Sequence, residues 1–174
     1  MPDESIYVPV GLTVSGLLGK RYLARFIDSI LIGLVSILIF RLFRAVGALN
    51  PGPPSALLLE IVLLVLWMVL WLAYGSLFES SPWQATLGKQ LMGLRVYDSH
   101  GERLRLPQAV MRNLVKDGPF LILSLVPSGP VLSLIWLGAH IVVLHRSPVY
   151  QAIHDRAAGS WVAAPEETIQ LRLT

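Results

Sequence analysis

The stretch "RYLARFIDSILIGLVSILIF", Arg21 to Phe40, is apolar over most of its length, yet it carries Arg25 and Asp28 near its start. An α-helix rises about 1.5 Å per residue and needs about 20 apolar residues to cross the hydrocarbon of a bilayer. We therefore predict a membrane-spanning helix over residues 22–43. Basic residues follow it where a signal peptidase would need small ones, so we expect the helix to be retained.

The composition of the whole chain agrees with a membrane protein. Its 174 residues have a mean hydropathy of +0.63, and 54% are hydrophobic against 14% charged, which is more apolar surface than a soluble domain of this size can bury. The net charge of +3 comes from basic residues that flank the apolar runs, so we expect no nucleic-acid partner. The absence of cysteine excludes disulfides and thiolate chemistry.

Further apolar runs predict three more spans, over residues 56–78, 108–126 and 131–145. The last two are separated by "PSGP", which breaks a helix. They form either a helical hairpin that returns to the cytoplasm or one kinked helix that leaves the C-terminus outside. Basic residues crowd the exit of the last run, and the positive-inside rule therefore favours the hairpin.

The segment between the second and third runs is basic, so we predict that it is cytoplasmic. Within it "GLRVYDSHGERLRL" alternates apolar and polar residues around a tight-turn sequence, which predicts a small β-hairpin. Near the C-terminus "SWVAA" is expected to lie extended beside this hairpin. The predicted fold class is mostly α: a polytopic helical bundle of two long spans plus a Pro-broken helical hairpin, with a cytoplasmic β-hairpin. Tails at 1–19 and 165–174 flank a membrane domain at 20–164.

The charges in the first span pose the functional question. Arg21 and Asp28 are seven residues apart, nearly two helical turns, so they share a helix face, and an ion pair along one helix is available. A charge at the centre of a bilayer costs about 2.5–3.5 kcal/mol on insertion scales. Either Arg21 and Arg25 reach the headgroups and Asp28 neutralises one of them, or Asp28 faces a polar cleft and takes up a proton or cation.

Other charged residues extend this set. Arg112 is expected either to meet Asp28 or Asp155 across the bundle or to anchor its helix at the interface. His154 precedes Asp155 at a helix start, where capping is a better explanation than a catalytic dyad. We expect Lys89 to contact lipid phosphate, and the aromatic stripe that includes Tyr74 to serve packing. The four histidines lack the spacing of a metal site, and no metal or cofactor is predicted.

Four stretches, taken together and in order, resemble the RDD family of small bacterial membrane proteins. The resemblance covers about Gly19 to Ala163. The stretches are "RYLARFID" at 21–28, "TLGKQLMGLRVYDSHGERL" at 86–104, "MRNL" at 111–114 and "HDRAAGSWV" at 154–162.

This resemblance implies a multi-pass domain in the bacterial inner membrane, for which transport is the usual suggestion. The family is named for one arginine and two aspartates, and these map onto Arg21, Asp28 and Asp155. The additional Arg25 leaves open which arginine pairs with Asp28. We expect both termini in the cytoplasm.

We therefore predict a transporter or an ion- or proton-translocation component, and not an enzyme. The alternative is a non-transporting membrane adaptor or assembly factor whose buried charges fix helix packing. The lipid bilayer is the expected partner, and a homo-oligomer and a membrane-protein partner both remain open. The proposed charge network consists of Arg21, Arg25, Asp28, Arg112 and Asp155.

Overall fold

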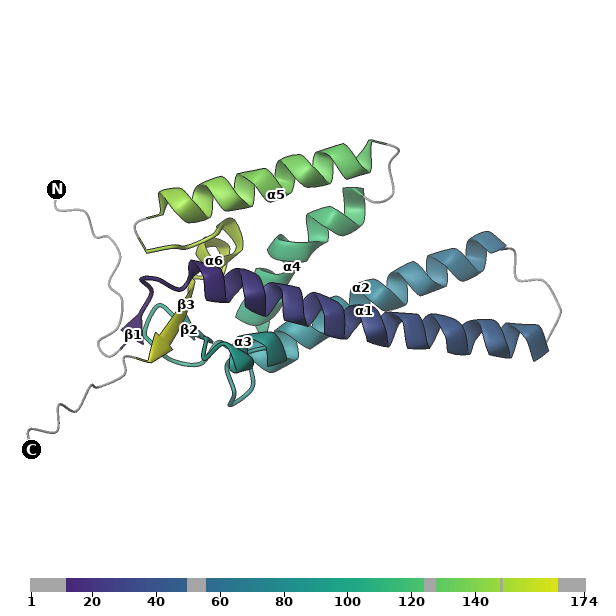
Figure 1. Ribbon diagram of the computed structural model, residues 1–174, viewed down its shortest axis with the longest axis horizontal. Coiled ribbons are helices and arrows are strands. Elements are labelled where there is room, and N and C mark those ends of the chain that lie inside the picture. Colours follow the sequence, from purple (N-terminus) through teal and green to yellow (C-terminus); the bar gives the residue numbers. More distant parts are fainter. Residues whose placement is uncertain (1–11, 50–55, 124–127, 148, 166–174) are drawn as a thin grey trace, which may run out of the picture.

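A computed structural model describes residues 12–49, 56–123, 128–147 and 149–165, and the described chain is mostly helical (Figure 1). The prediction of a mostly α-helical protein with a small β element is confirmed. In chain order the elements are β1 (Leu12–Thr13), α1 (Leu18–Leu49), α2 (Ala56–Glu79), α3 (Leu87–Leu91), β2 (Arg95–Asp98), α4 (Leu106–Leu123), α5 (Gly129–Arg146), α6 (Ile153–Ala157) and β3 (Ser160–Pro165).

Three helices in the described part of the chain are long and apolar enough to cross a membrane. They are α1 over Leu18–Ala45, α2 over Ile61–Glu79 and α5 over Gly129–Arg146, each with only 11% of its most apolar window buried. Large exposed hydrophobic side chains cover them, which fits lipid as their solvent. The predicted span at 108–126 corresponds to α4, which does not qualify because Arg112, Lys116 and Asp117 interrupt its apolar sequence.

Strands β1, β3 and β2 form a three-stranded antiparallel sheet in that order. The predicted hairpin is only partly correct. The turn at Asp98–Gly101 forms, with Gly101 at a φ of 80°, but the returning arm makes a single bridge, Tyr97 to Arg103. The strand that pairs with β2 is β3, the "SWVAA" segment, because Val96 and Val162 face each other and are both buried.

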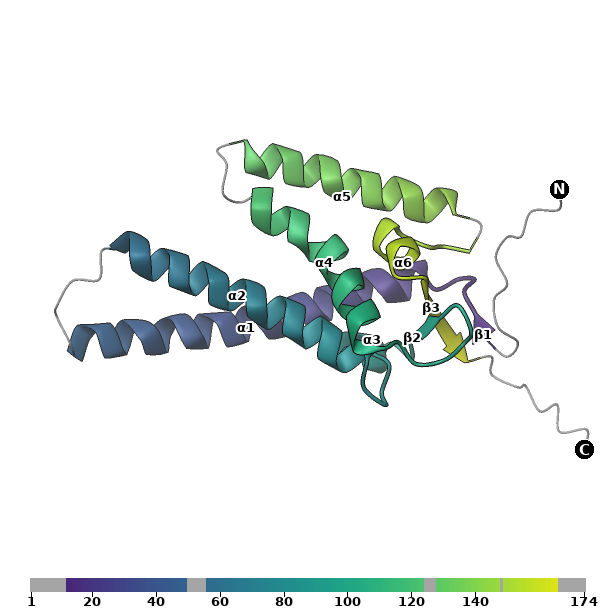
Figure 2. The same ribbon diagram turned by 180° about the vertical axis from the view of Figure 1, so that it is seen from behind.

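The sheet gathers with α3 and α6 at one end of the molecule, which we call the sheet end, and the α1–α2 pair extends away from it (Figures 1 and 2). The hydrophobic core lies at this end. It joins the start of α1 to the sheet and to α4, and consists of Leu17, Ala24, Leu94, Val96, Leu104, Ala109 and Val162. The apolar outer halves of α1 and α2 contribute little to this core.

Helices α4 and α5 lie side by side, with α4 leading away from the sheet end and α5 returning to it (Figures 1 and 2). The helix α4 continues through Pro119 to Leu123, although proline removes one backbone donor from the helix. The region predicted as either a hairpin or one kinked helix thus contains two separate helices. Most of the connection between them lies outside the described residues.

Parts of the predicted tails and loops also fall outside the described residues. These are positions 1–11 and 166–174 of the two tails and the proline-rich connection at 50–55. Residues 12 and 13, within the predicted N-terminal tail, form β1 and pair with the end of β3.

The close approach of α3 to α1 depends on Gly88, and this generates a first prediction. A Cβ at Gly88 would lie 2.2 Å from the Ala24 carbonyl oxygen and 2.9 Å from the Asp28 carboxylate. Gly88→Ala should therefore lower the free energy of unfolding by about 1–3 kcal/mol, the usual cost of overpacking. The measurement is thermal unfolding in detergent, followed by tryptophan fluorescence.

The matched control is Gly138→Ala in α5, where a Cβ would meet nothing within 4 Å. This variant should unfold at the wild-type temperature or above it, because alanine is the better helix former. Equal unfolding temperatures for wild type and Gly88→Ala would contradict the packing described here.

Candidate functional site

Arg112, on α4, is the centre of a buried ionic network at the sheet end. Its Nη1 donates to both carboxylate oxygens of Glu79, at 2.6 and 2.7 Å. Its Nη2 and Nε donate to Asp155 Oδ1 at 2.6 and 3.0 Å, and Nε also reaches Ser160 Oγ at 3.2 Å. Arg112 is only 1% exposed. Of its predicted partners it therefore meets Asp155, and one guanidinium joins α2, α4, α6 and β3.

Asp155 receives a second arginine from α1. Arg21 Nη2 donates to Asp155 Oδ2 at 2.6 Å, and Arg21 Nη1 donates to the Tyr150 carbonyl at 2.6 Å. The Ala152 backbone N–H donates to the same Asp155 oxygen at 3.1 Å, which satisfies a donor at the start of α6. Burial alone would raise the pKa of Asp155, but His154, Arg112 and Arg21 outweigh it and hold the pKa well below its ordinary value.

Glu79, at the end of α2, is the second carboxylate of this network, and the sequence analysis did not single it out. It is fully buried and accepts hydrogen bonds from Arg112, Lys89 and Asn113, the last at 3.0 Å. Lys89, expected to contact lipid phosphate, bonds Glu79 in the interior with its ammonium. Burial lowers the pKa of Lys89 to about 7, although the charge of Glu79 opposes this shift.

Asp28 is buried in a separate cluster and is 4% exposed. Its Oδ1 accepts from the Tyr74 hydroxyl at 2.6 Å and from the Gly88 N–H at 2.8 Å, and its Oδ2 accepts from Thr86 Oγ1 at 2.6 Å. In the part of the chain that the structure describes, Asp28 has no ion pair with a basic side chain. Its role there is to hold the start of α3 against α1.

The ion pair that the spacing made available along α1 is therefore absent among the described residues. Arg21 and Arg25 share the helix face with Asp28 as predicted, but both turn to acids on other helices. Arg25 Nη2 lies 2.5 Å from Asp117 Oδ1 on α4, and its guanidinium lies 4.5 Å from the Trp71 ring centroid. Hydrogen bonds from neutral donors occupy the Asp28 oxygens instead. Tyr74, expected to serve packing alone, supplies one of them.

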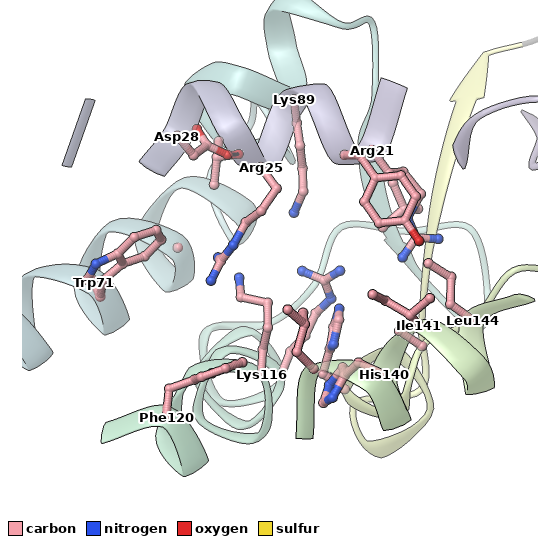
Figure 3. Close-up of a pocket in the computed structure, with 18 of the residues that line it drawn as sticks. Arg21, Arg25, Asp28, Trp71, Lys89, Lys116, Phe120, His140, Ile141 and Leu144 are labelled. Atoms are coloured by element: carbon pink, nitrogen blue, oxygen red, sulfur yellow. Dashed lines mark hydrogen bonds between the residues drawn. The ribbon is translucent and has the colours of Figure 1, made fainter. Parts of the chain in front are cut away.

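A cavity of about 210 Å³ lies between α1, α2, α4 and α5 next to this network. Arg21, Arg25, Lys89, Arg112 and Lys116 line one part of it, while aromatic and aliphatic side chains such as Trp71, Phe120 and Ile141 line the rest. Figure 3 shows the charged ends of Lys89, Arg25 and Lys116 directed into the same space. The cavity thus combines a cationic wall with an apolar one.

Two histidines complete the lining of this cavity. The rings of His140 on α5 and His154 on α6 stack with centroids 5.2 Å apart. Burial lowers the pKa of His154 well below its ordinary value, although Asp155 opposes the shift. His154 Nδ1 and His140 Nε2 are buried without a hydrogen-bond partner.

Comparison with known proteins agrees with these features. The family model described as "RDD family" matches residues 16–159. The chain belongs to the RDD family. The "Uncharacterized protein YxaI" of Bacillus subtilis (strain 168) is 30% identical over 104 residues, which cover 53% of this chain and 69% of that protein. No solved structure matches the chain.

The three residues that the family resemblance singled out, Arg21, Asp28 and Asp155, fall into two places in this chain. Arg21 and Asp155 form an ion pair at 2.6 Å, whereas Asp28 lies in the separate cluster with Tyr74 and Thr86. Arg112 and Arg25 belong to the network through Asp155 and Asp117 respectively. The sequence offered one signal for the missed Glu79: it is an acid at the end of an apolar run, where charge is costly unless paired.

The lowered pKa of Asp155 generates a second prediction. The pKa of Asp155 is about 3.9 in the unfolded chain and lower in the folded protein. The ionised carboxylate therefore stabilises the fold above the unfolded pKa, and this stabilisation is lost as the pH falls through the folded pKa. Asp155→Asn should lower the unfolding temperature at pH 6. Between pH 6 and pH 3 the unfolding temperature of the variant should fall less than that of the wild type. Thermal unfolding in detergent across this range is the measurement.

Glu102→Gln provides the matched control, because Glu102 is an exposed acid in the turn after β2. Its pH profile should follow that of the wild type. An Asp155→Asn profile parallel to the wild type over the whole range would show that the carboxylate is not held in its ionised form by the network.

Proposed function

We propose that this RDD family member is an ion- or proton-translocation component of the bacterial inner membrane, and that the charged cavity is its site. The observation that carries the proposal is the cavity itself, which is lined by five cationic side chains, two of them on α1, next to three helices that are long and apolar enough to cross a membrane. Ionisable groups at such positions are costly and, where present, usually line a pathway or a binding site.

The pairing of the strands supports an arrangement in the membrane with both chain ends on one face. Strands β1 and β2 both pair with β3, so the segments before α1, between α3 and α4, and after α6 meet in one sheet. The α1–α2 pair then crosses and returns, and α4 and α5 enter and return. The basic residues between α3 and α4 favour the cytoplasm for this face. We propose that both termini are cytoplasmic.

In this proposal the charged residues have different roles. Arg21 and Arg112 fix Asp155 at the cytoplasmic end of the cavity, which suits Asp155 to a gating role there. Arg25 and Lys116 line the cavity whereas their partner Asp117 does not, so these two side chains can meet an entering ion. Asp28 keeps its charge close to the cavity while its hydrogen bonds position α3.

A membrane adaptor or assembly factor is the second candidate, and a specific observation favours it. Every N–H-bearing nitrogen of the Arg112 guanidinium bonds a partner within the protein, so this part of the network is closed, as expected for charges that fix helix packing. The chain would then dock a membrane-protein partner or form a homo-oligomer through its exposed apolar helices. We propose no enzymatic activity for either candidate.

The substitution Asp28→Asn removes the negative charge of this side chain while keeping its hydrogen bonds, and this generates a third prediction. The amide is nearly isosteric: its oxygen can accept from Tyr74 and Gly88, and its nitrogen can donate to Thr86. The variant should keep the wild-type unfolding temperature but lose most ion or proton flux. Flux is measured in reconstituted vesicles that contain a pH-sensitive dye, under imposed gradients of sodium, potassium, phosphate and protons.

Thr13→Val is the matched control for reconstitution, because Thr13 is a polar residue of β1 outside the cavity. It should transport as the wild type does. Wild-type vesicles without flux above protein-free vesicles, together with a constant foreign protein on native gels, would favour the adaptor instead. Flux that survives in Asp28→Asn would leave Asp28 with a structural role alone.

A further inference from the structure

The cavity is unusual in the distribution of its charges. Of its described lining residues, five are cationic and one, Asp28, is an acid. The acids that balance the cations, Glu79, Asp117 and Asp155, bond them from behind and do not line the cavity. An entering ion would therefore meet the nitrogen atoms of the network and not its carboxylates.

Asp28 is the one acid among the described residues that line the cavity, but it does not offer a free carboxylate oxygen to an entering ion. Both of its oxygens already accept hydrogen bonds, from the Tyr74 hydroxyl, Thr86 Oγ1 and the Gly88 N–H. The whole network then contains five basic side chains and four carboxylates, so the basic groups outnumber the acids by one.

Several donors facing the cavity have capacity to spare. Lys116 Nζ donates to Asn113 Oδ1 and lies 3.5 Å from Asp117 Oδ2, and an ammonium carries three protons. The Arg25 side chain is 41% exposed and uses one nitrogen on Asp117.

We propose that this cavity binds a phosphate group, held chiefly by Lys116 and Arg25 with Lys89 and Arg112 behind them. Guanidinium and ammonium groups are the usual partners of phosphate oxygens, which act as acceptors toward several donors at once. A cavity of about 210 Å³ has room for a group of this size.

The phosphate group has two sources that the cavity accommodates. One is inorganic phosphate from the cytoplasm. The other is the headgroup of an anionic phospholipid, because Phe120, Leu137 and Ile141 form an apolar wall next to the cationic one. The inference that the phosphate group is translocated rests on the proposed function. Binding of the phosphate group can be measured without transport.

The experiment measures binding to the purified full-length chain in a non-ionic detergent. The added ligands are inorganic phosphate, a short-chain phosphatidylglycerol, and sodium chloride at matched ionic strength. Binding should raise the unfolding temperature, and it should change tryptophan emission because Arg25 stacks on Trp71. Lys116→Gln should weaken phosphate binding by about tenfold or more, and Lys116→Arg should retain it.

Arg103→Gln is the matched control, since it removes an exposed cation that does not line the cavity. Its binding should equal that of the wild type. Binding of inorganic phosphate supports a soluble anion, and binding of the phospholipid alone supports a headgroup site. Equal responses to phosphate, phospholipid and chloride, or full binding by a folded Lys116→Gln variant, would overturn the proposal.

The two proposals fail separately. Phosphate binding without flux in vesicles would leave the anion site and remove the translocation function. Flux of sodium, potassium or protons without any response to phosphate or phospholipid would keep the function and remove the anion site.

Discussion

The buried guanidinium of Arg112 is the interaction on which the sheet end depends. An isolated charge in the interior of a protein costs several kcal/mol, and removing one partner of a buried pair typically costs about 3–5 kcal/mol. Glu79 and Asp155 together satisfy Arg112, so the end of α2 and the start of α6 must both lie against α4. Hydrophobic packing alone does not determine this arrangement. The apolar surfaces of α1, α2 and α5 gain little from leaving lipid for protein, because lipid tails are as apolar as their side chains.

This constraint also determines which way the charges face. The carboxylates of Glu79, Asp117 and Asp155 bond their cations but do not line the cavity, and the charged ends of Lys89, Arg25 and Lys116 point into it (Figure 3). The network is closed around Arg112 and more open at Lys116 and Arg25. A structural role and a binding role are therefore compatible within one network, in different places.

The sequence predicted the elements of this fold better than its contacts. Long apolar runs predicted α1, α2 and α5, and the pairing of Arg112 with Asp155 was among the expected alternatives. The spacing of Arg21 and Asp28 correctly placed both on one helix face, but helical period cannot identify a partner 134 residues away, and Asp155 is that partner of Arg21. The same limit applies to β2, whose local turn indicated a hairpin while its partner β3 lies far along the chain. Glu79 was missed because the end of a span is an ordinary place for a solvated acid.

The separate cluster around Asp28 explains why α1 keeps an acid near the membrane. Asp28 accepts hydrogen bonds from Thr86 Oγ1 and from the Gly88 N–H, and these two bonds anchor the first turn of α3 against α1. Lys89 follows in the same turn and is thereby directed toward Glu79 and the cavity. A hydroxyl or amide at position 28 can accept some of these bonds, but only a carboxylate also adds a negative charge close to five cations. Asp28 therefore acts on the cavity through the position of Lys89 and through its field, without an ion pair of its own.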